Sequence, residues 1–175
     1  MIHPLDKFRY CPKCGSTHFE IKNEKAKKCA DCGFEYYFNS SAATVAVIEN
    51  GKGQILVARR GKEPAIGTYD LPGGFVDLNE TAEEAMAREV LEETGMKVSS
   101  LEYLFSIPNK YIYSDFEVQT LDMFFKCSVE DFSGMKAKDD VAELFFIDKD
   151  KLNHEDFGLH SIRQGVKLLK YRWKK

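Results

Sequence analysis

The sequence predicts a protein of two parts, a mixed α/β domain preceded by a small cysteine-rich module. Four of the five cysteines fall within the first 40 residues, where too few apolar residues are present to form a core. From residue 41 onward, short β-rich runs alternate with segments whose apolar residues recur at helical spacing. A chain of 175 residues has room for one domain and an appended module. We therefore expect the module to occupy residues 1–40 and the domain to occupy residues 41–175.

The charge balance argues against a protein that coats a nucleic-acid backbone. The formal net charge is −3 and the isoelectric point is about 5.9, whereas such binding needs a strong basic field. The first 40 residues carry seven Lys and Arg against five acidic residues, which is only a mildly basic excess. The sequence contains no apolar run of 18 residues and no apolar signal segment at its N-terminus. We expect a cytoplasmic protein whose partners include neither a membrane nor a nucleic acid.

Two C-x₂-C pairs predict a tetrahedral zinc site in the N-terminal module. The pairs are Cys11 with Cys14 and Cys29 with Cys32, each is followed by glycine, and fourteen residues separate them. Each pair suits a tight knuckle that directs two thiolates to one ion, and residues 17–26 suit a short hairpin between the knuckles. Because all four ligands are cysteines, no position is left for water, and we expect a structural Zn²⁺. Disulfides or four unrelated thiols are the alternative, which a reducing compartment disfavours.

The remaining part of the chain contains the predicted strands. Residues 43–48 and 54–59 are β-rich, and the intervening Glu49-Asn50-Gly51-Lys52-Gly53 is typical of a hairpin turn. Later strands are predicted at 101–107, 117–129 and 144–147. Cys127 lies in one of these apolar runs, where a buried thiol is expected in preference to a nucleophile. A C-terminal helix is predicted from apolar residues at helical spacing, namely Leu159, Ile162, Val166 and Leu169.

A helix with readable ends follows the loop Leu71-Pro72-Gly73-Gly74. Thr81 and Glu84 form a capping box at its start, and Gly95 is placed to end it. Spacings of three and four residues put the glutamates at 89, 92 and 93 on one face. The apolar residues Met86, Ala87, Val90 and Leu91 are expected on the other face.

The three glutamates suggest a cation site beside the glycine loop. Clustered carboxylates repel one another, and Arg88 alone cannot neutralise Glu89, Glu92 and Glu93. Hard oxygen ligands of this kind suit Mg²⁺ or Mn²⁺, ions that bind phosphates together with carboxylates. A solvated acidic helix face is the alternative interpretation.

The pattern Gly74-x₅-Glu80-x₇-Arg88-Glu89-Val90-x-Glu92-Glu93-x-Gly95-Met96 resembles the signature box of the Nudix hydrolases. The resemblance extends over about residues 41–150. It implies an α/β/α sandwich around a mixed β-sheet, and hydrolysis of a diphosphate linkage in a nucleotide-type substrate with the help of Mg²⁺ or Mn²⁺.

The resemblance also implies roles for individual residues of the box. Glu92 and Glu93 are the expected principal metal ligands, and the backbone carbonyl of Gly74 is an additional one. Glu89 is either a ligand or the general base for the attacking water. Arg88 is expected to orient the carboxylates through salt bridges, and Glu80 to support the loop or an outer water.

Candidate substrate-binding residues lie outside the box. Arg59 and Arg60 end a predicted strand and are able to contact phosphates, although they are equally compatible with an exposed strand end. The Nudix resemblance implies a further acidic residue from a later loop, for which Asp139, Asp140 and Glu143 are candidates. Three aromatic residues are placed either to stack on a base or to stabilise a β-hairpin, namely Tyr111, Tyr113 and Phe116.

A zinc ribbon in front of a Nudix domain resembles the NADH pyrophosphatases and ADP-ribose pyrophosphatases. The NADH pyrophosphatases carry S-Q-P-W-P-F-P-x-S after the box, whereas residues 106–114 read Ser-Ile-Pro-Asn-Lys-Tyr-Ile-Tyr-Ser and lack the tryptophan and two prolines. The resemblance thus leaves ADP-ribose, NADH and FAD as expected substrate types, with oxidised nucleoside triphosphates as a further alternative. A non-catalytic nucleotide sensor or nucleic-acid-binding regulator is the competing interpretation, against which the complete box argues. The zinc ribbon is expected to serve structure or dimerisation, and a homodimer is the default because family members are often dimers.

Overall fold

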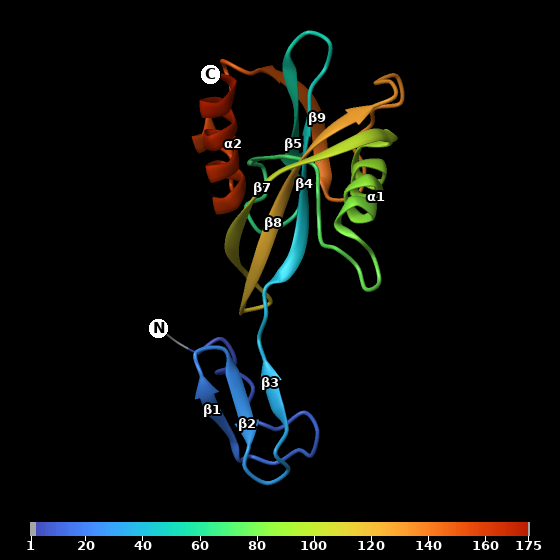
Figure 1. Cartoon of the computed structure of the whole chain (residues 1–175). Helices are drawn as coiled ribbons and strands as arrows, with labels where there is room; N and C mark the ends of the chain where they lie inside the picture. The colour runs from blue at the N-terminus through green and yellow to red at the C-terminus, as the bar shows by residue number, and fades with distance from the viewer. Residues whose placement is uncertain (1–2, 175) are drawn as a thin grey trace. The chain divides into compact units, whose positions relative to one another are not determined.

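The computed structural model describes residues 3–174, except for the side chain of residue 111 (Figure 1). The chain divides into two compact units, Met1–Ser40 and Ser41–Lys175.

The N-terminal unit, termed the cysteine module below, is built on a three-stranded antiparallel sheet. Its strands are β1 (Phe19–Asn23), β2 (Ala26–Cys29) and β3 (Glu35–Tyr37), in the order β1-β2-β3. The hairpin expected between the two cysteine pairs is confirmed, because β1 and β2 pair antiparallel with Phe19 opposite Cys29. The buried side chains of this unit include Leu5, Phe19 and Ala26, so its apolar core is small.

The second unit contains two three-stranded sheets. In the first, β4 (Ser41–Ile48) runs parallel to β8 (Phe116–Val129), which pairs antiparallel with β7 (Val98–Tyr113). In the second, β5 (Gln54–Arg60) lies between β6 (Tyr69–Asp70) and β9 (Val141–Asp148), antiparallel to both. The predicted mixed α/β class is confirmed, with the strands divided between a mixed sheet and an antiparallel sheet.

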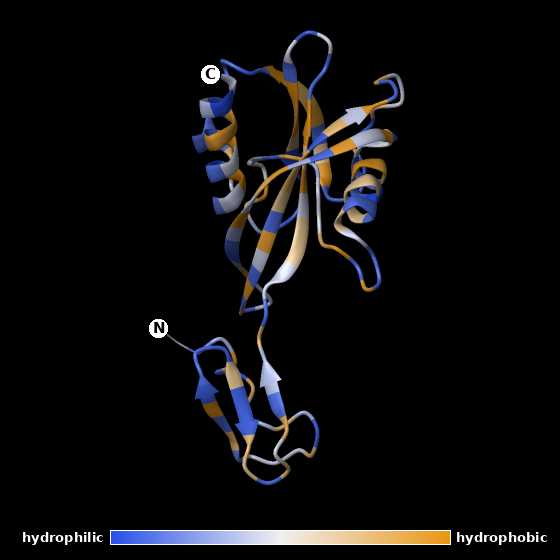
Figure 2. Ribbon diagram, viewed as in Figure 1, coloured by the Kyte–Doolittle hydropathy of each residue, from blue (hydrophilic) through white to orange (hydrophobic). Residues whose placement is uncertain are grey.

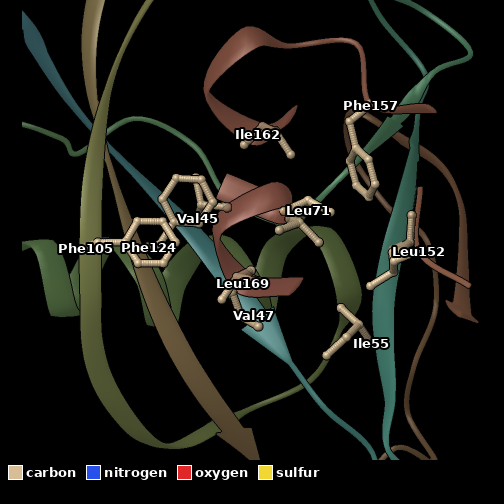
Figure 3. Packing of buried hydrophobic residues seen from close by; sticks show 12 residues of the cluster. Val45, Val47, Ile55, Leu71, Phe105, Phe124, Leu152, Phe157, Ile162 and Leu169 are labelled. Atoms are coloured by element: carbon tan, nitrogen blue, oxygen red, sulfur yellow. The ribbon is translucent and has the colours of Figure 1, made fainter. Parts of the chain in front are cut away.

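Two helices cover opposite sides of these sheets, α1 (Ala82–Thr94) and α2 (His160–Trp173), as Figure 1 shows. A short 3₁₀ helix, η1 (His154–Asp156), precedes α2. One apolar cluster packs α2 against the strands and includes Phe105, Phe124 and Ile162 (Figure 3). A second cluster includes Met86 and Val90 of α1. Helix α2 turns hydrophobic residues toward the sheets and most of its hydrophilic residues away from them (Figure 2). This arrangement is the α/β/α sandwich that the sequence resemblance implies.

The prediction that residues 43–48 and 54–59 pair as a hairpin is wrong, because the two strands do not pair with each other along their length. The turn itself forms, because the Asn50 N–H donates to the Gln54 carbonyl at 3.0 Å. Only a single β-bridge, between Glu49 and Ile55, joins the two segments, and β4 and β5 then enter different sheets. Turn residues specify a local reversal, whereas pairing partners are set by which faces are buried. Both strands are buried along most of their length, and each finds partners farther along the chain.

The strands β7 and β8 form one long hairpin that exceeds the predicted range of 101–107. The turn consists of Ser114 and Asp115, both with positive φ. Pro108 interrupts the strand-like sequence pattern, because proline cannot donate to a strand ladder. Pro108 is tolerated because β7 is an edge strand of its sheet.

Among the described residues, the helices of 13 and 14 residues lack the combination of length and apolarity needed to cross a membrane.

Candidate active site

Helix α1 has the ends that the sequence predicts. The Glu84 backbone N–H donates to the Thr81 hydroxyl at 3.2 Å, and the Thr81 N–H donates to the Glu84 carboxylate at 2.8 Å. Gly95 ends the helix in the left-handed region with φ 73°, and its N–H donates to the Leu91 carbonyl. The capping box and the C-terminal glycine are both confirmed, so the start and the end of this helix are fixed locally.

The face that α1 buries differs from the expected one. Met86 and Val90 are fully buried, but Leu91 is 44% exposed, and Glu93 is only 9% exposed. Leu91 follows Val90 by about 100° around the helix axis and points away from the sheet. Glu93 follows Val90 by three positions and therefore occupies the stripe where an apolar residue is expected. The helix thus turns one carboxylate inward and leaves Leu91 at the surface.

The glycine loop before α1 lies against β4 and against the helix carboxylates. The Thr44 N–H donates to the Gly74 carbonyl at 2.8 Å, and the Ala46 N–H donates to the Pro72 carbonyl at 2.7 Å. A Cβ atom at Gly74 would collide with the Glu89 carboxylate, which would have to move away from the loop. Glycine at this position therefore brings a carboxylate into contact with loop backbone.

Arg88 connects the helix to the loop that precedes it. Its guanidinium donates twice to Glu80, both at 2.8 Å, and once to the Phe75 carbonyl at 3.0 Å. It also donates to Glu89 at 2.8 Å and to Glu92 at 3.1 Å. These five bonds match the five N–H donors of arginine. The pKa of Glu80 falls to about 2, first because of its hydrogen bonds from Arg88. Arg88 therefore forms the expected salt bridges to the helix carboxylates at Glu89 and Glu92.

Glu93 is the most buried of the four glutamates that the box specifies. Its carboxylate accepts a hydrogen bond of 2.9 Å from the Gly73 N–H. Desolvation raises its pKa to about 8, and the negative charges of Asp70, Glu89 and Asp140 add to the rise. Burial also raises the pKa of Glu89. These carboxylates therefore share a region that lacks sufficient positive charge.

Asp70 forms a buried ion pair beside Glu93. Arg60 donates to its carboxylate at 2.5 Å, and the Leu71 N–H donates to it at 2.8 Å. Desolvation nevertheless raises the pKa of Asp70, since the effect of burial exceeds that of Arg60. Arg60 therefore does not fully neutralise the negative charge of the carboxylates in the site.

A cavity of about 230 Å³ opens beside these groups. It brings together the glycine loop, the inward-facing glutamate and several predicted substrate-binding residues; the residues concerned are Gly73, Gly74, Glu93, Arg60, Asp140 and Tyr113. Asp140 forms an ion pair with Lys62. Tyr113 is largely exposed, and the side chain of Tyr111 lies outside the described residues.

Arg59 lies outside this cavity. Its guanidinium donates to Glu143 at 3.0 Å and to the Gly67 carbonyl at 3.2 Å. It also lies over the rings of Tyr69 and Phe145, 5.1 and 5.5 Å from their centroids. Of the two strand-end arginines, only Arg60 faces the cavity.

The site contains polar residues that sequence reasoning missed. Four of them are buried, namely Asp70, Asn109, Thr120 and Asp122, and all four line the cavity. Asp122 carried a signal, because it is a charged residue within the apolar run 121–129. Asn109 carried none, because only the pairing of β7 with β8 brings it opposite Thr120.

The cysteine module contains a second cluster of metal-ligating groups. The four sulfur atoms of Cys11, Cys14, Cys29 and Cys32 lie within 4.8 Å of one another. Backbone N–H groups of Cys32 and Asp31 lower the pKa of Cys29 to about 7, despite desolvation. Within residues 3–174, no other group of three or more His, Cys, Asp or Glu residues meets this distance. Cys127, in contrast, is a buried core thiol whose pKa is raised to about 12 by desolvation.

The family model of the NUDIX domain matches residues 39–165. Relatives include an NAD-capped RNA hydrolase NudC of Haemophilus influenzae, 35% identical over 108 residues, which are 61% of this chain and 40% of the relative. The protein of the same name from Vibrio cholerae is 34% identical over 106 residues, covering 61% of this chain and 39% of the relative. These matches span well under half of the curated relatives' length.

Solved structures share the fold. A NUDIX hydrolase from Nitrosomonas europaea superposes with a TM-score of 0.71 at 20% identity, over 94% of this chain and 91% of that one. The NUDIX domain of Shewanella oneidensis NrtR, solved in complex with ADP ribose, superposes with a TM-score of 0.63 at 16% identity, over 78% of this chain and 91% of that one. With the family model covering most of the second unit, and with Gly74 and Glu93 of the box lining one cavity, the chain belongs to the NUDIX family.

Proposed function

We propose that this chain is a metal-dependent pyrophosphohydrolase. Its substrate would be a nucleoside diphosphate linked to another moiety, of the ADP-ribose, NADH or FAD type. Residues 41–175 would form the hydrolase domain, and residues 1–40 a zinc ribbon. The observation that carries the proposal is the burial of Glu93 in the wall of a cavity, where it faces further carboxylates.

The donor set at this cavity suits a hard divalent cation. Burial raises the pKa of Glu93, Glu89 and Asp70, so each of these carboxylates would gain from a cation nearby. Carboxylate oxygens and backbone carbonyls are the ligands that Mg²⁺ and Mn²⁺ prefer. The Gly74 carbonyl accepts the Thr44 N–H at 2.8 Å, whereas its second bond, from the Thr44 hydroxyl, is long at 3.5 Å and therefore weak. We therefore assign Glu92, Glu93 and the Gly74 carbonyl as ligands, and Glu89 as a ligand or the general base.

Bound metal would polarise the phosphoryl oxygens and lower the pKa of the attacking water. Arg88 would act through the glutamates, because it donates to Glu89 and Glu92 while Glu80 holds it from the other side. Arg60 and Asp140 would meet the substrate, since both line the cavity. If Glu89 is the base, its raised pKa places its proton transfer closer to neutral pH.

The names of the relatives bear on the substrate. The proteins that match this chain at 34–35% identity are called NAD-capped RNA hydrolases. An NAD cap contains the same diphosphate linkage as NADH, extended on one side by RNA. The sequence analysis predicts no nucleic-acid partner, and these names conflict with that expectation. NAD-capped RNA is therefore the second candidate substrate.

The four cysteines suit Zn²⁺ better than a hard cation. Thiolates are soft ligands, and four of them satisfy tetrahedral zinc without leaving a position for water. We therefore assign the zinc a structural role.

The first test is hydrolysis of ADP-ribose, NADH, FAD and an NAD-capped RNA with Mg²⁺ or Mn²⁺, comparing the wild-type protein with Glu93→Gln. We expect release of AMP, or of the decapped RNA, to fall by about a hundredfold or more in the variant, because a carboxylate ligand is lost. Glu83→Gln is the matched control, since Glu83 is an exposed glutamate of the same helix. Its activity should equal that of the wild type.

The competing sensor interpretation predicts a different result. A sensor would bind ADP-ribose or NADH tightly and hydrolyse no member of the panel with either metal. That outcome would remove the enzyme proposal and leave nucleotide binding as the function.

A further inference from the structure

The cavity of the candidate active site contains one buried polar atom without a partner. Asn109 is 4% exposed, and its Oδ1 atom accepts no hydrogen bond. It is the single buried side-chain oxygen or nitrogen in this condition among the residues that the structure describes. An unpaired buried acceptor costs free energy, so its presence in the wall of a cavity points to a ligand that donates to it.

The groups next to Asn109 leave it no donor. Thr120 lies directly opposite Asn109 on β8, and its hydroxyl donates to Asp122 at 2.5 Å. The hydroxyl of Ser161, on α2, donates to the other carboxylate oxygen of Asp122 at 2.5 Å. Both hydroxyl protons are therefore used within the protein. The surface formed by Asn109, Thr120 and Asp122, termed the polar floor, offers acceptors to a ligand.

Apolar residues face the same cavity from other elements. Val45 of β4, Leu159 before α2 and Ile162 of α2 line it together with the polar floor. Such a space suits a flat heterocyclic ring that presents N–H donors on one edge. Glu93 and Gly73 line this cavity as well, so ring and diphosphate would share one site.

We infer that the polar floor selects a substrate ring carrying an exocyclic –NH₂ group, whose N–H donates to Asn109 Oδ1. This inference rests on the proposed function, because it specifies which part of the nucleotide the same cavity reads. The –NH₂ group has two sources in a dinucleotide of this type, the amino group of adenine and the carboxamide of nicotinamide. Asn109 would be a specificity-determining residue and would take no part in bond cleavage.

The test compares NAD⁺ with two analogues of the same net charge, each lacking one of the two –NH₂ groups. Nicotinamide hypoxanthine dinucleotide replaces the adenine amino group with a carbonyl, and 3-acetylpyridine adenine dinucleotide replaces the carboxamide nitrogen with a methyl group. Equilibrium binding is measured by calorimetry without divalent metal, and kcat/KM is measured with Mg²⁺. We expect one of the two analogues to bind about tenfold more weakly than NAD⁺ to the wild-type protein. The analogue that is disfavoured identifies the source of the –NH₂ group.

Two variants of Asn109 assign that preference to its oxygen. Asn109→Leu keeps the branched shape of the side chain without the acceptor, and should remove the difference between NAD⁺ and the disfavoured analogue. Asn109→Asp keeps an oxygen acceptor and should retain the difference. Gln119→Leu is the matched control, because Gln119 precedes Thr120 on β8 and does not line the cavity. Thermal unfolding of Asn109→Leu should match or exceed that of the wild type, since the variant loses an unpaired buried acceptor.

Three results would overturn the inference: equal binding of all three dinucleotides, binding of none of them, or a preference that persists in Asn109→Leu. The first and third are compatible with hydrolysis and leave the proposed function standing. Selective binding of NAD⁺ without turnover would instead retain the role of Asn109 and remove the proposed hydrolase.

Discussion

The cysteine module and the NUDIX domain assemble their metal-ligating groups in opposite ways. In the module, four sulfur atoms lie within 4.8 Å of one another, and few apolar side chains surround them. In the domain, two apolar clusters hold the fold. There the carboxylates are held by separate donors, with Glu89 and Glu92 bonded to Arg88 and Glu93 bonded to the Gly73 backbone.

This difference teaches what each ion would contribute. A small module whose ligands already converge gains its folding free energy from the metal. A domain that folds on its own core does not need its ion for folding, so its carboxylates are free to be arranged for chemistry. The arrangement still has a cost, because burying Glu93 without a full counter-charge opposes folding.

The largest expected effect is the loss of the module on removal of zinc. We expect a zinc chelator, or Cys29→Ser, to abolish hydrogen-exchange protection in residues 1–40 and to leave residues 41–175 protected. Zinc contributes on the order of 10 kcal/mol to the folding of such modules. The measurement is hydrogen exchange by mass spectrometry, together with zinc content.

Cys127→Ser provides the matched control for this experiment. Cys127 is buried in the domain, so its substitution should lower the stability of the domain and leave the zinc content unchanged. Retention of zinc or of protection in Cys29→Ser would show that the cysteine cluster does not hold the module together.

The next effect concerns the domain at different pH values. The pKa of Glu93 rises from its ordinary 4.5 to about 8 in the folded protein. Between these values the folded state holds a proton that the unfolded chain has lost, so the stability of metal-free protein should fall as the pH rises from about 4.5 to about 8. The free energy of unfolding should decrease by a few kcal/mol over this range. Urea denaturation at a series of pH values measures it.

Glu93→Gln tests whether Glu93 causes this decrease in the free energy of unfolding with rising pH. Glutamine carries no titrating group, so the variant should lose this part of the pH dependence. Added Mg²⁺ should restore stability to the wild type above about pH 8 and have little effect on the variant. An unchanged slope in the variant would place the pH dependence elsewhere in the domain.

A smaller effect is expected at Arg88, which holds the carboxylates in place. Arg88→Lys keeps the charge and replaces five donors in a fixed fork with three on a flexible stem. We expect kcat/KM to fall about tenfold and the free energy of unfolding to fall by about 2 kcal/mol, because bidentate bonds to Glu80 are lost. Activity and stability equal to those of the wild type would show that the network of Arg88 does not position the glutamates.

The local signals in the sequence were sufficient for helix α1 and for the cysteine pairs. Thr81, Glu84 and Gly95 specify helix ends through contacts with residues three or four positions away, which a sequence displays directly. The same holds for the spacing of the cysteines. The mixed α/β class was predictable from the alternation of apolar patterns, and the α/β/α sandwich from the Nudix box.

Non-local contacts account for what the sequence did not reveal. The separation of β4 from β5 depends on where β8 and β9 pair, and these strands lie far along the chain. The polar floor depends on the register that sets Asn109 opposite Thr120. Arg59 and Arg60 are adjacent in sequence, yet only the fold directs Arg60 alone into the cavity.

The smallest expected effect tests the rotation of α1 about its axis. The apolar pattern of the sequence predicted the wrong buried face for this helix. Val90 is fully buried against the sheet and Leu91 is 44% exposed, although both are apolar and adjacent. Val90→Ala should lower the free energy of unfolding by about 2 kcal/mol, because it removes buried methyl groups and leaves a cavity. Leu91→Ala should change it by less than about 0.5 kcal/mol, since the side chain loses little contact. Equal losses would mean that α1 turns Leu91 inward, and the same rotation would carry Glu93 away from the cavity.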